Sequence, residues 1–401
     1  MKILFITDNF PPEVNAPANR TFEHCREWVK NGEEVTVITC FPNFPKGKIY
    51  PGFKNKWKKI EYIEGVKVIR VWSYISPNEG FIKRTLDYIS FSLTSFLAGL
   101  TINTDLIIAT SPQFFTTISG RWLSFFKNKP WVLEVRDLWP ESIVAVGAMK
   151  RNILIKYFEY IEKRMYKKAS KIIVVTDSFK KNIIEKNIDP SKIYIHKNGA
   201  NLDFFKPTSK NTILENELKI KGKKVFAYIG THGMAHGLDF IFRSIKKLEI
   251  EKPDFHFLFL GDGAERKKLI ELKNTLKLTN VTMLPSVSKE DVIKYLSLMD
   301  YALVNLRKSE TFFSVIPSKI FEAAAMEKPI LLGLEGETKS IIEKYNSGIC
   351  FEPENEKDFL DKIIKITDLK NNETLIKGCR DMSLDFDRKK IALNMLNDLK
   401  I

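Results

Sequence analysis

The stretch VFAYIGTHGMAHGLD, residues 225–239, decides the fold class of this chain. It starts as an apolar run typical of a buried strand, passes through a loop with three glycines and two histidines, and continues into a helical pattern. A strand that turns directly into a helix is the unit of a parallel sheet covered by helices on both faces. In such sheets ligands lie beyond the carboxyl ends of the strands, so we expect the functional residues in loops of this kind.

The same alternation extends along the chain in both directions. Strand-type runs lie at residues 2–7, 34–39, 66–72, 105–110, 131–136, 171–176, 225–230, 255–261, 280–284, 301–306 and 329–333, and helical patterns in the first half lie at 20–30, 81–100, 112–127, 151–168 and 178–187. A chain of 401 residues is too long for one ordinary core. The sequence therefore predicts an α/β protein with two doubly wound, Rossmann-like domains, residues 1–205 and 206–384, that face each other across a cleft. We expect a last helix at about residues 385–401 to pack back on the first domain.

Two glycine loops are candidate phosphate sites. Their glycines permit a close approach of the backbone to a diphosphate, and the histidines of the first loop supply hydrogen-bond donors. The candidate residues are Gly230, His232, Gly233 and His236 in the first loop, and Gly261, Gly263 and Arg266 in and after the second loop. Turn chemistry alone also explains either loop. The second loop is not a dinucleotide fingerprint, because it lacks the third glycine and no acidic residue closes the following strand, which argues against an NAD enzyme.

The segment IPSKIFEAAAMEKPI, residues 316–330, is the strongest candidate for a ligand site. Pro317 suits the first turn of a helix, so free N–H groups around Ser318 and Lys319 would form a positive end that attracts phosphate. Lys319 adds a full charge, and Glu322, about one turn further on, could accept hydrogen bonds from the diol of a ribose. An ordinary amphipathic helix with a solvated Glu322 is the alternative.

Acidic residues give two further hypotheses. Asp137 follows a strand and could contact a sugar hydroxyl or stabilise developing positive charge, or it could simply cap its loop. The D-x-D sequence at residues 385–387 stands near a helix start, where capping explains it better than metal binding. We therefore expect no metal and no cofactor.

The net charge of +15, with 64 Lys and Arg against 49 Asp and Glu, lies mostly in the first half of the chain. This excess favours a partner rich in phosphate, such as nucleic acid, an anionic membrane or a lipid phosphate, although a lysine-rich proteome explains it equally well. The four cysteines have no paired or metal-ligand spacing, and the chain starts without the apolar core of a signal peptide. We therefore expect a cytoplasmic protein. The longest uncharged run, residues 88–104, is too polar and too short to span a membrane comfortably.

These residues resemble those of bacterial glycosyltransferases of family 4, which have the GT-B fold. The resemblance covers nearly the whole chain and rests on six segments in family order: ITDNFPPEVNAPANR, RDLWPES, NGANLDFF, YIGTHGMAHGLD, FLGDGAERKKL and IPSKIFEAAAMEKPI. It is nearest to the WbuB-like branch, which is associated with transfer of N-acetyl-L-fucosamine in O-antigen and capsule assembly.

The resemblance implies retaining transfer of a sugar, such as an N-acetylated deoxyhexosamine, from a UDP-sugar to a polyprenyl-diphosphate-linked saccharide, without an obligatory metal. It implies that the first domain binds the acceptor and that the second binds the nucleotide sugar. In this scheme Glu322 holds the ribose, the helix near Pro317 holds the diphosphate, and Val287 and Ser288 lie near the base. Asn15, Arg20, Arg136 and Asp137 border the acceptor, and the expected catalytic residues are Asp137, Lys319 and Glu322.

The chain departs from the wider family at two places. Ser314 stands where many members have a glutamate eight positions before Glu322, so this chain has a hydroxyl where the family usually contacts the donor sugar through a carboxylate. Thr231 and His236 stand where many members have an arginine and a lysine. Neutralisation of the diphosphate must then depend on Lys319, on helix dipoles, and on Arg307 or Arg266.

The basic segment KGKIYPGFKNKWKK, residues 46–59, mixes six lysines with three aromatic residues. That mixture suits an anionic membrane surface, and Lys83 and Arg84 precede the long apolar helix, although a solvated loop would look the same. We expect docking on the inner face of the plasma membrane. Two rival functions remain: a GT-B nucleotide-sugar epimerase, and a basic nucleic-acid-binding protein, which would not explain the phosphate loops of the second half.

Overall fold

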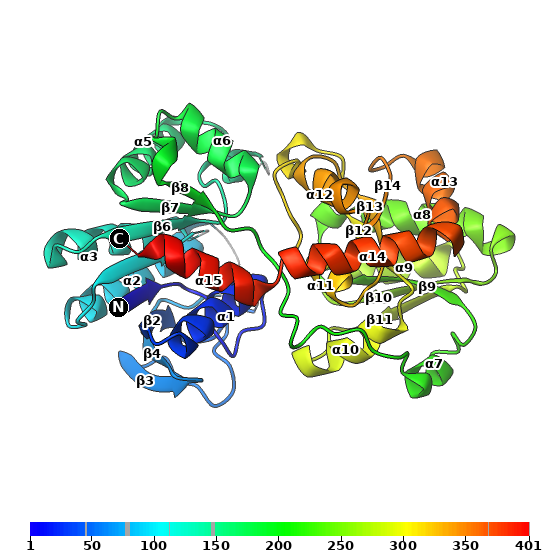
Figure 1. Ribbon diagram of the computed structural model, residues 1–401, viewed down its shortest axis with the longest axis horizontal. Helices are drawn as coiled ribbons and strands as arrows, with labels where there is room; N and C mark the ends of the chain where they lie inside the picture. Colours follow the sequence, from blue (N-terminus) through cyan, green and yellow to red (C-terminus); the bar gives the residue numbers. More distant parts are fainter. Residues whose placement is uncertain (45, 77–80, 112, 146–148, 368, 401) are drawn as a thin grey trace. The chain divides into compact units, whose positions relative to one another are not determined.

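The computed structural model divides the chain into two compact units (Figure 1). It describes every residue except 45, 77–80, 112, 146–148, 368 and 401. The first unit comprises Met1–Lys197 and Arg388–Ile401, and the second comprises Asn198–Asp387. Residue 112, where we expected a helix to begin, and residue 401, at the end of the expected last helix, lie outside the described residues.

The first unit is built on an eight-stranded sheet in the order β3-β4-β2-β1-β5-β6-β7-β8. Its strands are β1 (Lys2–Ile6), β2 (Glu34–Cys40), β3 (Lys58–Ile63), β4 (Val66–Val71), β5 (Leu106–Thr110), β6 (Trp131–Val135), β7 (Lys171–Val174) and β8 (Ile193–Ile195). All neighbours are parallel except β3 and β4. Because β1 pairs with β2 on one side and β5 on the other, the winding reverses between β1 and β5.

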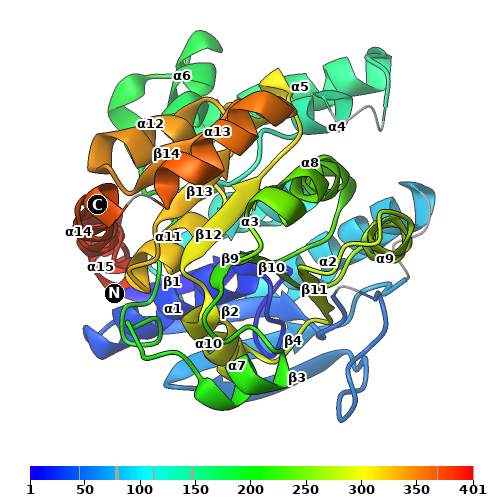
Figure 2. The ribbon, with the colours of Figure 1, turned by 90° about the vertical axis from the view of Figure 1, so that its right-hand side faces the viewer.

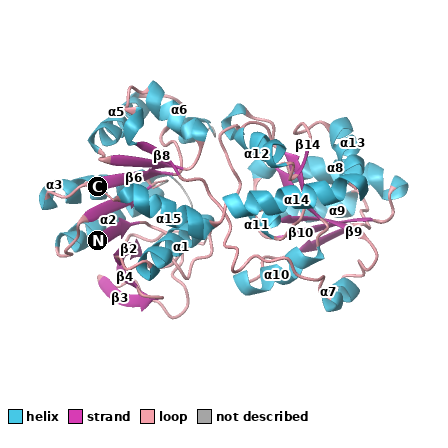
Figure 3. Cartoon of the chain, in the orientation of Figure 1, coloured by secondary structure: helices cyan, strands magenta, loops and turns pink. Residues whose placement is uncertain are grey.

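Helices cover both faces of this sheet, as the alternation of apolar side chains along β1 requires (Figure 3). The helices are α1 (Ala16–Lys30), α2 (Phe81–Leu100), α3 (Phe114–Lys127), α4 (Glu141–Ala145), α5 (Ile153–Lys168), α6 (Asp177–Glu185), the short η1 (Pro190–Lys192) and α15 (Arg388–Leu399). On one face Ile3 and Phe5 pack with residues of α1 and α15. On the other face Leu4 and Ile6 pack with residues of α2, α3 and α5.

The last helix, α15, is part of the first unit although it ends the chain. The indole N–H of Trp28 on α1 donates to the carbonyl oxygen of Ala392 at 2.8 Å. Arg388 forms a buried ion pair with Glu23 at 2.6 Å. The first unit therefore holds segments from both ends of the chain.

The second unit is built on a six-stranded, wholly parallel sheet in the order β11-β10-β9-β12-β13-β14 (Figure 2). Its strands are β9 (Lys224–Ile229), β10 (Phe255–Leu260), β11 (Val281–Leu284), β12 (Tyr301–Asn305), β13 (Ile330–Gly333) and β14 (Gly348–Cys350). Its helices are α7 (Thr212–Glu217), η2 (Met234–His236), α8 (Leu238–Glu251), α9 (Arg266–Thr275), α10 (Lys289–Leu298), η3 (Glu310–Phe312), α11 (Lys319–Ala325), α12 (Glu337–Tyr345), α13 (Glu356–Ile366) and α14 (Leu369–Asp385). The winding reverses between β9 and β12, and the carboxyl ends of these two strands are the place where such a sheet binds ligands.

Three strands were not expected from the sequence, namely β3, β8 and β14, and all lie at sheet edges. β3 corrects two expectations: the first sheet is not wholly parallel, and the basic segment 46–59 is not all loop, since β3 begins at Lys58. The sequence of β3, KKIEYI, places charged residues among its apolar ones, because an edge strand is largely exposed. Within the described part of the chain, no helix is both long enough and apolar enough to cross a membrane.

Candidate functional site

Three loops meet at the carboxyl ends of β9, β10 and β12. The backbone N–H of His232, after β9, donates to the carbonyl of Asp262, after β10, at 2.8 Å. The backbone N–H of Arg307, after β12, donates to the carbonyl of Ala235 at 2.8 Å, and the side-chain amide of Asn305 donates to the carbonyl of His236 at 2.8 Å. The β9 loop is therefore fixed from both sides at the point where the winding reverses.

Glycines make this close approach possible. A Cβ atom on Gly261 would lie 1.8 Å from the carbonyl oxygen of Gly230, and one on Gly263 would lie 2.5 Å from that of His232. A Cβ on Gly230 would lie 2.8 Å from the Nζ of Lys319. Gly261 and Gly263 are thus required by packing against backbone atoms, whereas the atom nearest to Gly230 is the end of a flexible lysine side chain and Gly233 has no contact closer than 3.5 Å.

Lys319 brings a positive charge to this edge. The helix α11 begins at Lys319 with Ser318 as its N-cap residue, so Pro317 lies just before the helix, and its first turn does not begin there as the sequence suggested. The Lys319 ammonium lies 3.9 Å from the centroid of the Tyr228 ring. Burial lowers the pKa of Lys319 to about 8, and Glu322 opposes this shift. In the part of the chain that the structure describes, no ion pair joins Lys319 to a carboxylate.

Two histidines surround the same tyrosine. The ring centroids of His232 and His236 lie 5.9 and 5.8 Å from that of Tyr228. The His232 side chain is fully buried, yet neither ring nitrogen has a hydrogen-bond partner among the described residues, and Nδ1 of His236 has none either. Buried polar groups in folded proteins are nearly always paired, so these nitrogens indicate a place for a polar ligand.

Both imidazoles are neutral at pH 7. Burial, with Arg266 and Lys319 nearby, lowers the pKa of His232 to about 4. Burial and Lys319 lower the pKa of His236 to about 4. Each ring then carries one N–H donor. Two cations, Lys319 and Arg266, and two neutral donors, His232 and His236, form a set that can bind an anion; Nε of Arg266 is also unpartnered.

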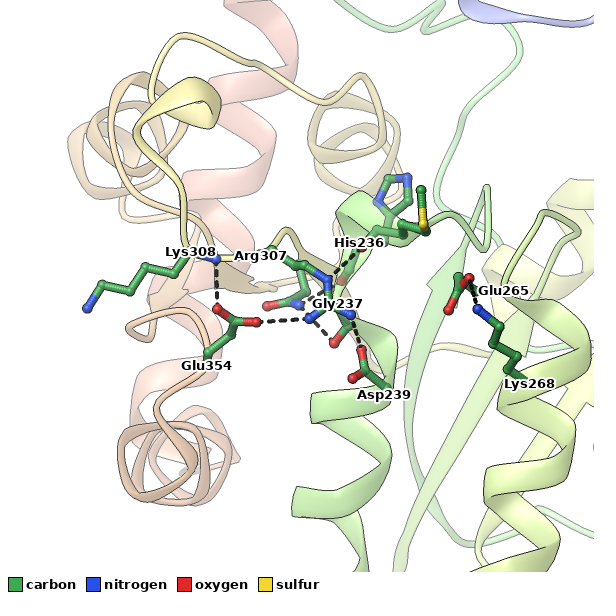
Figure 4. A network of polar contacts seen from close by, with 10 residues as sticks. His236, Gly237, Asp239, Glu265, Lys268, Arg307, Lys308 and Glu354 are labelled. Carbon is green, nitrogen blue, oxygen red and sulfur yellow. Dashed lines mark hydrogen bonds and ion pairs between the residues drawn. The ribbon is translucent and has the colours of Figure 1, made fainter. Parts of the chain in front are cut away.

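Arg307, a candidate for neutralising a diphosphate, has internal partners instead (Figure 4). Its guanidinium donates to Asp239 at 2.7 Å, to Glu354 at 3.1 Å and to the carbonyl of Met234 at 2.8 Å. These contacts hold η2 against the start of α8 and against residue 354. The assignment of Arg307 to the phosphate site remains a prediction, and Arg266 and Lys319 are the better candidates.

The remaining candidates of the second unit lie on neighbouring loops. Ser314 lies in the turn after η3, and this loop is held in place because the Thr338 hydroxyl donates to the carbonyl of Val315 at 2.6 Å. Glu322 lies half-buried in the first turn of α11. Val287 is half-buried and Ser288 is the exposed N-cap of α10, in the loop after β11. The expected role of Val287 and Ser288 near the base stays a prediction.

In the first unit, Asn15 and Arg20 have structural contacts. The Asn15 side chain caps α1 by accepting from the N–H of Ala18 at 2.8 Å. Arg20 is buried and donates to Glu134 at 3.2 Å and to the carbonyls of His196 and Lys197 at 3.0 Å. Arg20 therefore joins α1, β6 and the end of the β8 segment, and its expected contact with an acceptor stays a prediction.

Arg136 and Asp137 lie at the carboxyl end of β6. The Asp137 carboxylate accepts from the Ser142 hydroxyl at 2.9 Å, and burial raises the pKa of Asp137. Burial lowers the pKa of Arg136, whose Nε is unpartnered. Asp8, after β1, is half-buried; desolvation raises its pKa, and the nearby charge of Arg136 opposes this shift. Asp8 was not among the sequence candidates, although it is the first acidic residue after a buried strand.

Tyr228 and Asn305 were also missed. Tyr228 supports Lys319 and donates from its hydroxyl to the carbonyl of Thr231 at 2.7 Å, while Asn305 fixes the β9 loop. Both are polar residues at the end of a buried strand, and that position is the signal that could have identified them. Among the described residues, no three His, Cys, Asp or Glu side chains gather in a way that could hold a metal ion.

Comparison with known proteins identifies a family on each half of the chain. The family model Glycosyltransferase Family 4 matches residues 18–204, and Glycosyl transferases group 1 matches residues 209–381. A protein of Escherichia coli strain K12, named as the colanic acid biosynthesis glycosyl transferase WcaI, is 22% identical across 100% of both chains. The UDP-Gal:alpha-D-GlcNAc-diphosphoundecaprenol alpha-1,3-galactosyltransferase of Escherichia coli is 24% identical over 59% of this chain and 61% of that protein.

Solved structures agree on the fold. Anabaena Alr3699/HepE, determined in complex with UDP and glucose, superposes with a TM-score of 0.73 at 16% identity and covers 100% of this chain and 99% of that chain. The N-acetyl-L-fucosamine branch named by the sequence resemblance stays a prediction. Because both halves match glycosyltransferase family models and the fold is shared, the chain belongs to the family 4 glycosyltransferases and has the GT-B fold.

Proposed function

We propose that this glycosyltransferase moves a sugar from a UDP-sugar to a polyprenyl-diphosphate-linked saccharide in bacterial polysaccharide assembly, with retention at the anomeric carbon. The second unit binds the donor and the first binds the acceptor. Two relatives named for polysaccharide or lipid-linked sugar chemistry, and a similar fold that was solved with UDP and glucose, support this choice of substrates.

The observation that carries the donor assignment is the buried, unpartnered His232 beside Lys319, where three loops meet. A diphosphate there would receive N–H bonds from His232 and His236 and the charge of Lys319. Its binding would satisfy polar groups that the protein leaves unpaired, so the site favours a ligand rich in oxyanions. This donor set replaces the arginine and lysine that many family members have after the first strand of this domain.

The same groups would stabilise the leaving group. Transfer breaks the bond between the anomeric carbon and the oxygen of the β-phosphate, and it forms a bond from that carbon to the acceptor oxygen. Negative charge develops on the departing diphosphate, where Lys319 would act electrostatically. With retention, the acceptor hydroxyl approaches on the leaving-group side and gives its proton to the departing phosphate oxygen. No protein base is then needed, and Asp137 would help only by orienting or stabilising the sugar.

The donor sugar and acceptor are the finer part of the proposal. The resemblance predicts N-acetyl-L-fucosamine, and the relative named for a diphosphoundecaprenol substrate supports a lipid diphosphate as the acceptor carrier. Ser314, in place of a glutamate, would give the donor sugar a hydroxyl contact in place of a carboxylate contact.

A two-stage experiment tests the function. First, a panel of UDP-sugars, with GDP- and TDP-sugars for comparison, is screened for thermal stabilisation of the protein, since a ligand that binds only the folded state raises its stability. Second, the stabilising donor is incubated with polyprenyl-diphosphate-linked acceptors, and release of UDP is measured together with the glycosylated product. Equal stabilisation by every nucleotide sugar, or conversion of the donor to an epimer without release of UDP, would overturn the proposal.

A further inference from the structure

The outward side of α2, in the first unit, carries a stripe of exposed apolar residues. Its members follow each other at intervals of three or four positions, and each is between 38% and 49% exposed: Leu86, Ile89, Leu93, Leu97 and Leu100. Such spacing places them on one face of the helix. The opposite side of α2 packs on the sheet and on α3, so the stripe is not needed for the core.

α3 extends this stripe sideways. Trp122, Phe125 and Phe126 are 44%, 68% and 65% exposed. Phe96 of α2 joins the two sets, because its ring centroid lies 5.6 Å from that of Trp122 and 5.5 Å from that of Phe126. The two helices pack closely, with a hydrogen bond of 3.0 Å between the Ser95 and Ser119 hydroxyls. The leucines and aromatic rings therefore form one continuous apolar patch, which we call the α2–α3 patch.

α5, which packs against α3, carries exposed apolar side chains of its own. α5 is adjacent to α3: the ring centroids of Phe158 on α5 and Phe114 on α3 are 5.9 Å apart. Its exposed apolar residues are Ile153, Leu154, Tyr157 and Tyr160. Large contiguous apolar patches such as the α2–α3 patch are rare on soluble proteins, and where they occur the surface is usually an interaction site.

The charges around the α2–α3 patch are mainly positive. Arg121, Lys129 and Lys168 line a shallow concavity of about 510 Å³ beside Phe125. Lys83 and Arg84, at the start of α2, are also exposed. Two acidic residues of α5 form ion pairs within the unit: Glu159 pairs with Arg151 at 2.9 Å, and the buried Glu162 pairs with Lys186 at 2.8 Å.

We propose that the α2–α3 patch docks the enzyme on an anionic lipid bilayer, with lipid phosphates in the concavity formed by Arg121, Lys129 and Lys168. Aromatic and leucine side chains beside lysine and arginine suit the boundary between lipid head groups and acyl chains. The proposal rests on the proposed function, because docking on a bilayer brings the enzyme to a lipid-linked acceptor. A second copy of the chain fits less well, since pairing of two such surfaces would bring like charges together.

The patch is a better candidate than the basic segment 46–59. In that segment the ring of Phe53 lies under Lys59 and Arg70, at 4.9 and 5.2 Å, and the Tyr50 hydroxyl donates to the carbonyl of Phe44 at 2.6 Å. Only Trp57 of its three aromatic residues is highly exposed. The segment therefore offers charge with little apolar surface to insert.

Flotation of the full chain with vesicles tests the proposal. Vesicles of phosphatidylcholine alone are compared with vesicles that also contain phosphatidylglycerol, at low and high salt. We expect binding to the anionic vesicles that weakens with salt. The double variant Phe125→Ser, Phe126→Ser should bind at least about tenfold less, because both rings are exposed in the free protein and are buried in lipid. The double variant Arg121→Glu, Lys129→Glu should lose the preference for phosphatidylglycerol.

Two controls make the outcome decisive. Ile250→Ser removes an even more exposed apolar side chain, from the second unit, and should bind vesicles like the unmodified protein. Stabilisation by a UDP-sugar should be unchanged in both double variants, so loss of lipid binding is separable from failure of the donor site. Absence of flotation at low salt, unaltered binding of the phenylalanine variant, or a dimer in solution that this variant dissociates would each overturn the proposal.

Discussion

The two sheets end in edges of opposite chemistry. At the edge of the first unit, Arg20 has a partner in Glu134 and Asp137 has one in Ser142, whereas Nε of Arg136 has none among the described residues. At the edge of the second unit, both ring nitrogens of His232 and Nδ1 of His236 lack hydrogen-bond partners among the described residues, and the Lys319 ammonium lies 3.9 Å from the centroid of the Tyr228 ring.

This difference indicates what each edge can bind. Burial raises the pKa of Asp8 and Asp137, because the charged carboxylate is disfavoured at this edge. Their oxygens can accept hydrogen bonds from neutral hydroxyls. The second edge has donors and positive charge in a buried setting, where an oxyanion is held more strongly than in water. An uncharged sugar suits the first edge, and a diphosphate suits the second.

Gly261→Ala should have the largest effect, because it breaks the second edge itself. The new Cβ would lie 1.8 Å from the carbonyl oxygen of Gly230, so the two loops must separate. We expect loss of UDP-sugar stabilisation and a loss of about 2–4 kcal/mol in the free energy of unfolding. Isothermal titration and urea unfolding measure the two effects.

Gly222→Ala is the matched control for this variant. Gly222 also has a positive φ of +76°, but nothing lies within 4 Å of the position of its Cβ. It should cost about 1 kcal/mol of stability from backbone strain alone and leave donor binding intact. Normal donor binding by Gly261→Ala would show that contact between the loops does not form the site.

Lys319→Ala should lower kcat by about 100- to 1,000-fold, as removal of a group that stabilises a leaving charge does. The fold should survive, because a buried ammonium with a lowered pKa is itself a cost to the folded state. Initial rates of UDP release with a saturating donor measure the effect. Lys267→Ala, an exposed lysine of α9, and Asp385→Ala, in the D-x-D sequence, are the controls and should stay within about twofold. Near-normal turnover by Lys319→Ala would refute the assignment.

The pH dependence of donor affinity should also trace to Lys319. Its pKa is about 8 in the free protein, so the ammonium loses its proton as the pH rises through 8. A diphosphate binds the charged form, so affinity for a UDP-sugar should fall by up to about tenfold per pH unit above 8, with uptake of a proton on binding. Calorimetry at pH 8.5 in two buffers of different ionisation enthalpy measures that uptake. The Lys319→Ala protein should show neither effect.

The stability of the free protein should change in the opposite direction. Between the folded pKa of about 8 and the ordinary value of 10.5, the unfolded chain binds more protons at this lysine than the folded chain. The contribution of Lys319 to the free energy of unfolding therefore increases with pH in this window. Comparison of unfolding curves for the unmodified protein and Lys319→Ala isolates this contribution, and identical pH profiles would contradict it.

Most of the fold could be predicted from local sequence, because buried parallel strands consist of uninterrupted runs of apolar residues. The short edge strands β8 and β14, of three residues each, and the charged β3 lack that signal. The glycine loops were identified by their position after strands. Their tightest contacts, however, are with one another, and no local pattern shows which loop a glycine faces.

The partners of two predicted site residues, Arg20 and Arg307, could not be read from the sequence, because they lie far away along the chain. Arg20 follows a loop that looked suited to an acceptor, but its partners Glu134 and His196 are 114 and 176 positions away in sequence. Arg307 likewise meets Asp239 and Glu354, which are 68 and 47 positions away. Sequence position predicted that these side chains lie near a sheet edge, and only the three-dimensional structure gives their partners.

Asp137→Asn should have the smallest effect. It tests whether the edge of the first unit only orients a neutral sugar. The amide can still accept the hydrogen bond from Ser142, and the negative charge it removes is one that burial already disfavours. If the first edge only orients a neutral sugar, kcat/KM for the acceptor should fall by about three- to tenfold, equivalent to a weakened hydrogen bond, while affinity for the UDP-sugar stays unchanged. Ser142→Ala, which keeps the carboxylate but removes its partner, should give a loss of similar size. A loss of about 100-fold or more in kcat for Asp137→Asn, with Ser142→Ala near normal, would instead mean that a negative charge at Asp137 stabilises the transition state, and the division of labour between the two edges would be wrong.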